Sequence, residues 1–296
     1  MQSDGIELGD FKSPTQGIRI SNPNERKLNK INMVVFITGI SSGFGQETAK
    51  LLAQQGHTIY GTVRREVEQL PQVHYLKLDV RDRGAVQKAV DGIVEKEGRI
   101  DVLVNNAGMG IGGPLEFATE EEIRLQMDSN FMGLVHCVDA VLPHMRQHGS
   151  GKIIALSSIG GLMGLPFQGF YSASKFAIEG YCEALRLETK PFGITVTVIR
   201  PGDFSTGFTG SRKKAVNEEA FRAYPAYQKA IDKVEHDEKG GLKPQVVAQK
   251  ISKVIRMKHP CYGYVVSSLE QRLSVFLKQI LPAKWFAAIL GKYYYL

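Results

Sequence analysis

Tyr171 and Lys175 carry two side chains that can exchange protons, and they are four residues apart in the chain. In a helix this spacing places both side chains on one face. A phenol has an ordinary pKa of about 10, but a neighbouring ammonium stabilises the phenolate and lowers that pKa. The pair therefore indicates a tyrosine that acts as a general acid or base.

Ser158 supplies a second hydroxyl close to this pair in the chain. It directly follows Lys152–Ser157, whose apolar run predicts a strand, and it precedes the predicted helix Tyr171–Thr189. In open α/β sheets, ligands bind at the carboxyl ends of the strands. We therefore expect the hydroxyls of Ser158 and Tyr171 to meet at that edge of a sheet.

A glycine-rich turn links the predicted strand Met33–Thr38 to the predicted helix Phe44–Gln55. Glycines permit a tight turn and a close approach of the backbone, and the start of the helix offers free N–H groups to a pyrophosphate. The turn therefore predicts dinucleotide binding. Its glycines and the residues between them are Gly39, Ser41, Ser42, Gly43, Phe44 and Gly45.

Four motifs in this order resemble the classical short-chain dehydrogenases/reductases. They are the turn with its G-x3-G-x-G spacing, Asn105–Gly108 after a predicted strand, the Tyr171/Lys175 pair, and Pro201–Gly202 followed by Thr206. The resemblance covers about residues 33–268. Within the family, residues 158–179 and 106–114 look most like the 17β-hydroxysteroid dehydrogenase group.

This resemblance implies a role for each matching residue. Ser158 would orient the substrate oxygen, Lys175 would also hold the nicotinamide ribose, and Asn130 would support a proton relay through water. The implied catalytic set is Asn130, Ser158, Tyr171 and Lys175. Besides the glycine-rich turn, the implied cofactor-binding residues are Arg64, Asp79, Asn106, Ala107, Gly108, Tyr171, Lys175, Pro201, Gly202 and Thr206.

The end of the predicted strand His57–Val63 favours NADP(H) as the cofactor. An acidic residue there would bind the adenosine ribose and repel a 2′-phosphate. Val63 occupies that position instead, and Arg64 can pair with a phosphate. NADP-binding relatives often carry a basic residue in the glycine-rich turn, where this chain has Ser41 and Ser42. By the same resemblance, Asp79 would contact the adenine.

Strands alternating with helices predict an α/β fold with a doubly wound, Rossmann-type parallel sheet in a single domain. A further helix is expected from Thr119, the N-cap of a capping box, to Gln147, with a kink or interruption at Pro143. The other expected strands are Val73–Leu78, Ile100–Asn105 and Ile194–Arg200, with a helix over Asp82–Glu97.

Four regions are expected along the chain. Residues 1–32 form an N-terminal extension, 33–268 the catalytic domain, and 269–296 a basic C-terminal helical tail. Residues 203–240 within the domain form a substrate loop that is rich in aromatic residues. Such a segment is typical of a lid over an apolar pocket, and equally of an amphipathic surface helix.

The net charge of +7 is concentrated at the C-terminal end, because residues 241–296 hold nine basic residues and one acid, Glu270. A uniformly basic nucleic-acid-binding protein would not show this distribution. In the tail, Leu273, Phe276 and Ile280 belong to an apolar helical stripe, and Trp285 begins a second apolar set. The tail could make peripheral contact with a membrane, or dock on its own domain or on a sister subunit.

The sequence therefore predicts an NADP(H)-dependent oxidoreductase that interconverts a ketone and a secondary alcohol on a hydrophobic substrate. A steroid is the first choice, followed by a 3-ketosphingoid base and then a 3-oxoacyl thioester. A non-catalytic nucleotide-binding sensor is the alternative from another class. Three scattered cysteines favour a cytoplasmic location and argue against a Cys-based metal site. The resemblance also implies a homodimer or homotetramer, with membrane association through the tail left open.

Overall fold

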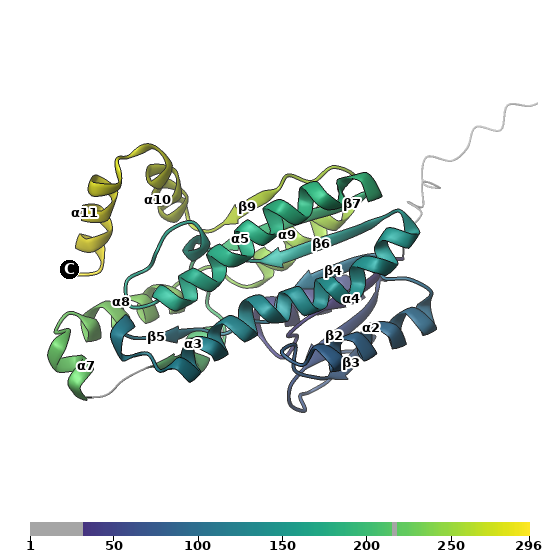
Figure 1. Ribbon diagram of the computed structural model, residues 1–296, viewed down its shortest axis with the longest axis horizontal. Helices are drawn as coiled ribbons and strands as arrows, with labels where there is room; N and C mark the ends of the chain where they lie inside the picture. Colours follow the sequence, from purple (N-terminus) through teal and green to yellow (C-terminus); the bar gives the residue numbers. More distant parts are fainter. Residues whose placement is uncertain (1–31, 215–217) are drawn as a thin grey trace, which may run out of the picture. The chain divides into compact units, whose positions relative to one another are not determined.

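Seven parallel strands form the central sheet of the computed structural model, which describes residues 32–214 and 218–296 (Figure 1). Their order is β3-β2-β1-β4-β6-β7-β9, so the chain reverses its direction across the sheet between β1 and β4. The strands are β1 (Val34–Ile37), β2 (Thr58–Val63), β3 (Val73–Lys77), β4 (Val102–Asn105), β6 (Gly151–Leu156), β7 (Ile194–Pro201) and β9 (Gly263–Val266). Two short strands, β5 (Ile111–Gly112) and β8 (Lys213–Lys214), pair separately.

Both faces of the sheet are covered by helices. Every residue of β1 is buried, and successive side chains point to opposite faces. Val34 and Phe36 pack into the core beneath α2 (Arg83–Glu97), α4 (Gly133–His148) and α5 (Gly169–Thr189). Val35 and Ile37 pack into the second core, beneath α1 (Gly43–Gln54) and α9 (Gln245–Arg256). The continuous apolar run of this strand therefore fits a sheet buried on both sides.

The predicted doubly wound sheet is confirmed, and all six predicted strands form close to their expected ends. Three strands were missed. β9 has only one fully buried residue, and β5 and β8 have two residues each. The two-residue strands leave no periodicity to detect, and β9 lacks the continuous burial that marks β1 and β4, which have the same length.

The predicted helix from Thr119 to Gln147 is interrupted, but not at Pro143. The capping box at Thr119 is present, and α3 (Glu120–Met127) follows it. Residues Asp128–Met132 then form a π-helical turn before α4 begins, and Pro143 lies within α4. The helix therefore continues through Pro143, where a kink or an interruption was expected, and the observed interruption lies at the π-turn that contains Asn130. Single π-turns of this kind occur frequently at functional sites.

The substrate loop forms short helices beyond the carboxyl edge of the sheet. These are α6 (Phe208–Ser211), α7 (Glu218–Ala223) and α8 (Tyr227–Lys239). Tyr227, at the start of α8, is fully buried, so this segment is more than a surface helix. Residues 1–31 and 215–217 lie outside the described residues, and with them almost all of the expected N-terminal extension.

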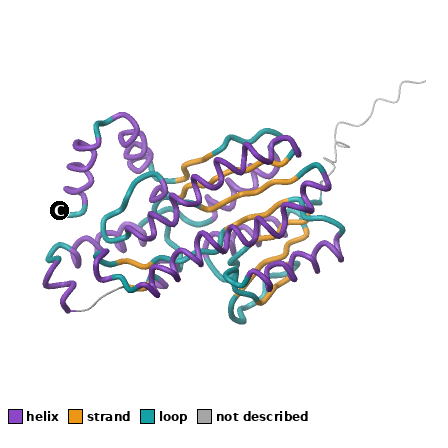
Figure 2. Tube along the Cα trace, in the orientation of Figure 1, coloured by secondary structure: helices purple, strands orange, loops and turns teal. Residues whose placement is uncertain are grey.

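The C-terminal tail forms two helices, α10 (Leu269–Ile280) and α11 (Ala283–Tyr293), joined at Leu281–Pro282 (Figure 2). Val275 and Phe286 are buried against Met163, and Tyr294 is buried against Ala230 and Val234 of α8. One side of this helical hairpin is thus docked on the chain's own domain, which was one of the expected outcomes. In the part of the chain that is described, no helix has the length and apolar character needed to cross a membrane.

Candidate active site

The glycine-rich turn is folded as a cradle at the carboxyl end of β1. Gly39 and Gly43 have φ values of +71° and +60°, which glycine adopts most readily. A Cβ placed on Gly45 would lie 2.2 Å from the carbonyl oxygen of Gly39. Ser42 caps α1 without a side-chain hydrogen bond, and the first turn of α1 holds no acidic residue. These features fit a pyrophosphate bound at the start of α1.

Asn106 and Thr38 hold this turn against the end of β4. The Asn106 amide nitrogen Nδ2 donates to the carbonyl oxygens of Thr38 (2.9 Å) and Gly39 (2.8 Å). The Thr38 hydroxyl accepts hydrogen bonds from the backbone N–H groups of Asn106 (3.0 Å) and Ala107 (2.9 Å). The turn and the Asn105–Gly108 motif therefore form one hydrogen-bonded unit. Thr38 was not among the predicted site residues.

At the expected adenosine end of the site, Asp79 is held by Arg81. The Arg81 Nη2 donates to Asp79 Oδ2 at 2.7 Å. Burial opposes ionisation of Asp79, but the hydrogen bonds from Arg81 and the charge of Arg64 outweigh it and lower the pKa of the carboxyl group. Arg64 is exposed beside the buried Val63. No acidic side chain therefore occupies the end of β2.

Tyr171 and Lys175 share one face of α5, as predicted. The Lys175 Nζ lies 5.7 Å from the centre of the Tyr171 ring and donates a 2.8 Å hydrogen bond to the carbonyl oxygen of Leu156. Burial lowers the pKa of Lys175 to about 8, against the charge of Glu179. The expected lowering of the tyrosine pKa is not found: burial raises the pKa of Tyr171 to about 12, although a hydrogen bond with Ser158 opposes this.

Asn130 lies within the π-turn and is buried. Its Oδ1 accepts from the backbone N–H of Met109 at 2.8 Å. Its Nδ2 donates to the carbonyl oxygen of Met109 and to Ser174 Oγ, both at 3.0 Å. Asn130 therefore ties the loop after β4 to α5, which carries Tyr171 and Lys175. It does not line the large cavity described next.

One cavity of about 1530 Å³ runs from the glycine-rich turn past Tyr171 to the C-terminal hairpin. Of the predicted site residues, only Gly45 and Asn130 do not line it. Those that the structure brings together around it are Gly39, Ser41, Ser42, Gly43, Phe44, Arg64, Asp79, Asn106, Ala107, Gly108, Ser158, Tyr171, Lys175, Pro201, Gly202 and Thr206.

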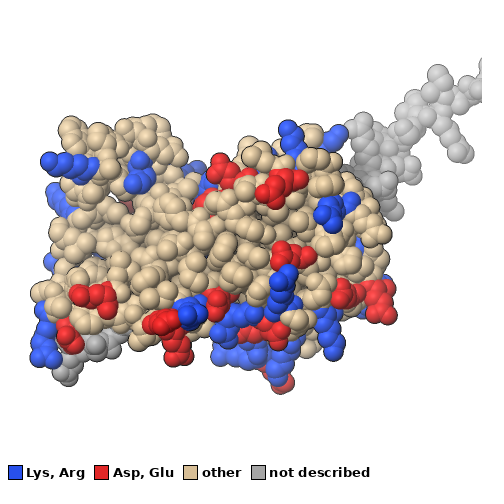
Figure 3. Space-filling view, in the orientation of Figure 1, with Lys and Arg blue, Asp and Glu red and all other residues tan. Residues whose placement is uncertain are grey.

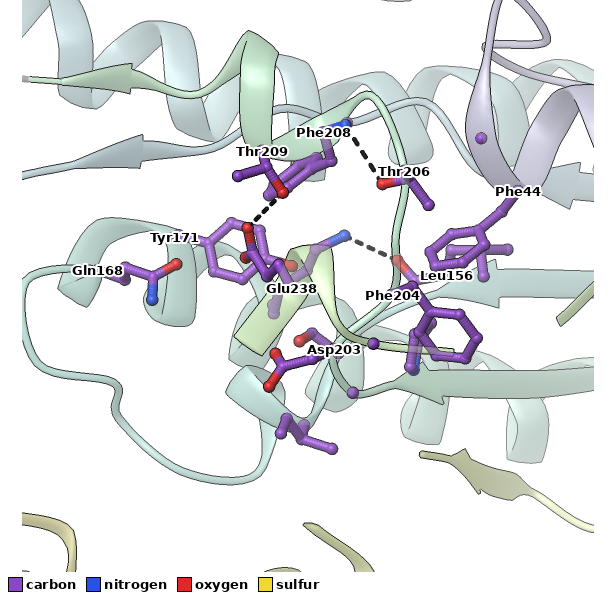
Figure 4. Close-up of a pocket in the computed structure, with 18 of the residues that line it drawn as sticks. Phe44, Leu156, Gln168, Tyr171, Asp203, Phe204, Thr206, Phe208, Thr209 and Glu238 are labelled. Atoms are coloured by element: carbon purple, nitrogen blue, oxygen red, sulfur yellow. Dashed lines mark hydrogen bonds between the residues drawn. The ribbon is translucent and has the colours of Figure 1, made fainter. Parts of the chain in front are cut away.

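A charged wall of the cavity, formed by Asp203, Asp237 and Glu238, was not predicted (Figure 4). Glu238 accepts a 2.6 Å hydrogen bond from Thr209 and forms an ion pair with the buried Arg212. Asp237 pairs with Lys233 at 2.9 Å. Asp203 has no cationic partner among the described residues, and accepts a 2.6 Å hydrogen bond from Gln271. Its members come from two segments, Asp203 after β7 and Asp237–Glu238 near the end of α8, and residue spacing alone does not indicate that these segments meet.

The carboxyl group of Asp203 titrates abnormally. Partial burial and the negative charges of Glu238 and Asp237 raise the pKa of Asp203 to about 6, although Arg212 and Gln271 oppose the shift. In the view of Figure 4, the carboxylate of Asp203 is drawn farther from the Tyr171 ring than Glu238 is. A carboxyl group with a raised pKa therefore lines the same cavity as Tyr171 and Lys175.

Comparison with known proteins agrees with this geometry. The family model of the short chain dehydrogenases matches residues 33–217. A 3-ketodihydrosphingosine reductase from Bacteroides thetaiotaomicron is 48% identical over 250 residues, which are 84% of this chain and 93% of that protein. Human 17-beta-hydroxysteroid dehydrogenase type 1 is 36% identical over 257 residues, 78% of this chain and 76% of that protein.

A solved structure of a short-chain dehydrogenase from Streptomyces avermitilis superposes with a TM-score of 0.76 at 29% identity, and the match covers 88% of this chain and 96% of that one. The family model covers more than half of the chain, and its members use nicotinamide dinucleotides. The sheet, the glycine-rich cradle and the Tyr171/Lys175 pair are the parts that such a cofactor requires. The chain belongs to the short-chain dehydrogenase family and is an oxidoreductase.

Proposed function

We propose that this oxidoreductase uses NADPH to reduce a long-chain amino ketone of the 3-ketosphingoid class. The observation that carries the proposal is the contrast between the two walls of the cavity around Tyr171. One wall holds the carboxylates of Asp203, Asp237 and Glu238, and another is built from apolar side chains of the C-terminal hairpin. A substrate with a cationic head could pair with the carboxylates, and its long hydrocarbon chain could pack against the apolar wall. The 48% identical reductase from Bacteroides supports the same substrate class.

The residues at the cavity suit reduction of a carbonyl group. A bound NADPH supplies the hydride that reaches the carbonyl carbon. Tyr171 gives its hydroxyl proton to the carbonyl oxygen, and Ser158, hydrogen-bonded to Tyr171, orients that oxygen. Because burial raises the pKa of Tyr171 to about 12, the phenol is protonated at neutral pH and ready to donate. The ammonium of Lys175 then stabilises the phenolate that remains.

NADPH is proposed over NADH because of the charges near Arg64. An acidic residue at the end of β2 would repel a 2′-phosphate, and Val63 stands there instead. Arg64 and Arg65 line the cavity at this end, and both are exposed. Arg81 also lines it but is engaged with Asp79. Arg64 is thus the residue we assign to the 2′-phosphate.

A steroid ketone, the first choice from sequence, becomes the second candidate. The 36% identical human steroid dehydrogenase supports it, and the cavity is large enough for a ring system. However, a neutral steroid offers no group to pair with Asp203, whose carboxylate has no cationic partner among the described side chains. A 3-oxoacyl thioester has the same shortcoming. The charged wall therefore ranks the amino ketone first.

Turnover assays test the proposal directly. Purified protein is given NADPH or NADH together with 3-ketosphinganine, a steroid ketone or a 3-oxoacyl thioester, and oxidation of the cofactor is followed by absorbance. We expect the amino ketone with NADPH to give the highest kcat/KM. Faster turnover of the steroid ketone would contradict the proposed substrate class, and faster turnover with NADH would contradict the proposed cofactor.

A Tyr171→Phe variant separates the enzyme from a non-catalytic nucleotide sensor. The variant should lose turnover while its NADPH affinity, measured by fluorescence titration, stays close to that of the parent protein. If neither protein turns over any of the ketones although both bind NADPH, the sensor interpretation replaces the enzyme.

We also propose that the protein forms a homodimer or homotetramer through α4 and α5. Phe176 and Leu187 of α5 support this, because their apolar side chains are 46% and 69% exposed. Light scattering of the parent protein and of a Phe176→Ser variant tests it, since the variant should shift towards the monomer.

A further inference from the structure

The C-terminal hairpin exposes large apolar side chains on the side that does not touch the domain. Phe276 and Ile280 of α10 are 54% and 57% exposed, and Trp285 of α11 is 66% exposed. Isolated apolar side chains are ordinary on a protein surface. Here they are concentrated on two short consecutive helices. We call these three residues, together with the exposed Leu269, Leu273 and Ile289, the outer apolar face.

The predicted apolar stripe of α10 is divided between two sides. Leu273, Phe276 and Ile280 are exposed, whereas Leu277 and Leu281 are partly buried. These two residues pack on the docked side with Val275 and Phe286, which are buried. The hairpin therefore has two apolar sides, and within the described chain only one of them packs on the domain. The other side exposes its apolar residues and is available to contact a partner.

The charge of the hairpin indicates the chemistry of that partner. Exposed basic side chains flank the outer apolar face, and Glu270 is the only acidic residue of the tail. Figure 3 shows lysine and arginine side chains among uncharged ones over α10 and α11, at the upper left. A surface that presents both apolar and basic groups is complementary to an anionic lipid bilayer. The basic residues that flank this face are Arg272, Lys284 and Lys292, whereas the Nζ of Lys278 lies 5.1 Å from the ring of the buried Phe286 on the docked side.

The substrate cavity reaches this same surface. Leu273 and Ile289 line the cavity and are also 54% and 51% exposed, so the cavity extends to the outer apolar face. Phe286 and Leu290 add further apolar side chains of the hairpin to the lining of the same cavity. If the hairpin lay on a bilayer, the hydrocarbon chain of a substrate could therefore pass from the lipid into the cavity while it contacts apolar side chains.

We propose that the outer apolar face docks on an anionic lipid surface. Trp285, Phe276 and Ile280 enter the interface between headgroups and acyl chains, and Arg272 and Lys284 pair with lipid phosphates. Docking places the mouth of the cavity against the bilayer, from which a long-chain substrate can enter without crossing water. The lipid contact itself does not depend on which ketone the enzyme reduces.

Trp285 makes the contact measurable, because it is the only tryptophan of the chain. Full-length protein is titrated with vesicles of phosphatidylcholine alone or of phosphatidylcholine mixed with phosphatidylglycerol, without substrate or cofactor. We expect a blue shift of the tryptophan emission and co-sedimentation with the anionic vesicles only. Added salt should weaken both, since it screens the charge contribution.

Two double variants separate the apolar and charged contributions. Phe276→Ser/Ile280→Ser and Arg272→Glu/Lys284→Glu should each weaken binding to anionic vesicles about tenfold or more. None of these four side chains lines the cavity. Turnover of a short, water-soluble ketone should therefore remain close to that of the parent protein, which also shows that the variants are folded.

Matched controls lie at the opposite edge of the sheet. Phe192 and Lys190 precede β7, and Lys258 precedes β9, whereas the hairpin follows the carboxyl end of β9. All three are exposed. The variants Phe192→Ser and Lys190→Glu/Lys258→Glu should bind vesicles like the parent protein. Equal losses in the controls would overturn the assignment of the contact to the hairpin.

A second copy of this chain is the competing occupant. In that case the blue shift would rise with protein concentration in the absence of vesicles, and light scattering would show that Phe276→Ser/Ile280→Ser dissociates the assembly. That result, or equal binding to neutral and anionic vesicles, would overturn the proposal. Failure of 3-ketosphinganine as a substrate would leave it intact, since vesicle binding is measured without turnover.

Discussion

Thr38 and Asn106 join the end of β1 to the end of β4 by reciprocal hydrogen bonds: the Asn106 side chain donates to the Thr38 carbonyl oxygen at 2.9 Å, and the Asn106 backbone N–H donates to the Thr38 hydroxyl at 3.0 Å. Thr38 is 1% exposed, so its hydroxyl has no access to water as an alternative partner. The two strands flank the point at which the sheet reverses direction. The cofactor cradle thus depends on a contact between residues distant in the sequence.

The Thr38 hydroxyl should be essential to this contact. Thr38→Val keeps the shape of the side chain but leaves the N–H groups of Asn106 and Ala107 without their acceptor. We expect the free energy of unfolding in urea to fall by about 2 kcal/mol and the NADPH affinity to fall about tenfold. Thr38→Ser, which retains the hydroxyl, should behave like the parent protein. Equal behaviour of the Val and Ser variants would contradict this role.

Gly45 should not tolerate a side chain. A Cβ there would lie 2.2 Å from the Gly39 carbonyl oxygen and 2.5 Å from Asn106 Nδ2, so Gly45→Ala should displace the turn and abolish measurable NADPH binding. Gly92 is the matched control, because it lies within α2 and a Cβ there would meet nothing within 4 Å. Gly92→Ala should raise the free energy of unfolding by roughly 0.5–1 kcal/mol. Calorimetric titration and urea unfolding measure the two effects.

The sheet and the cofactor side of the site were predictable because their signals are local. The apolar run Val34–Ile37, the glycines after it and the Tyr171/Lys175 spacing each lie within a few residues of one another. The capping box at Thr119 was found for the same reason. A turn, a cap and a shared helix face are set by neighbouring residues, so a single sequence is enough to infer them.

The charged wall of the cavity was not predicted, although its three residues lie within the segment 203–240 that was expected to form the substrate loop. The approach of this segment to the C-terminal tail depends on the three-dimensional fold. Asp203 follows β7, Glu238 ends α8, and Leu273 belongs to the tail, yet all three line one cavity. The π-turn at Asn130 was missed because the spacing of apolar residues does not distinguish a single π-turn from a regular helix. The rise in the pKa of Tyr171 was missed because it results from burial, which spacing alone does not reveal.

Lys175 should set the alkaline limit of activity. Burial lowers its pKa to about 8, so the ammonium loses its proton above that pH and no longer stabilises the Tyr171 phenolate. We expect kcat for ketone reduction to fall above about pH 8 as one proton is lost. Arginine keeps its charge at higher pH, so Lys175→Arg should lack this alkaline decline even if its overall rate is lower. An identical decline in both proteins would assign it to another group.

Asp203 should make the stability of the protein depend on pH near neutrality. Its pKa is raised to about 6 in the folded chain, so the folded state binds the proton more tightly than the unfolded state does. The resulting stabilisation is complete below the unfolded pKa and is lost as the pH rises through about 6. Asp203→Asn removes this dependence. Between about pH 4.5 and pH 7.5, the variant should therefore gain of the order of 1 kcal/mol relative to the parent protein in urea unfolding.

Asp203 should also distinguish an amino ketone from a neutral ketone. Its carboxylate, ionised above about pH 6, faces the cavity without a cationic partner among the described residues, so a substrate ammonium would supply one. At about pH 8, Asp203→Asn should raise KM for 3-ketosphinganine about tenfold and leave KM for its neutral N-acetyl derivative unchanged. Asp232→Asn is the control, because Asp232 is exposed on the same helix segment as the wall and does not line the cavity. If Asp203→Asn changed KM equally for both ketones, Asp203 would contribute to the shape of the cavity but would not recognise the charge of the substrate.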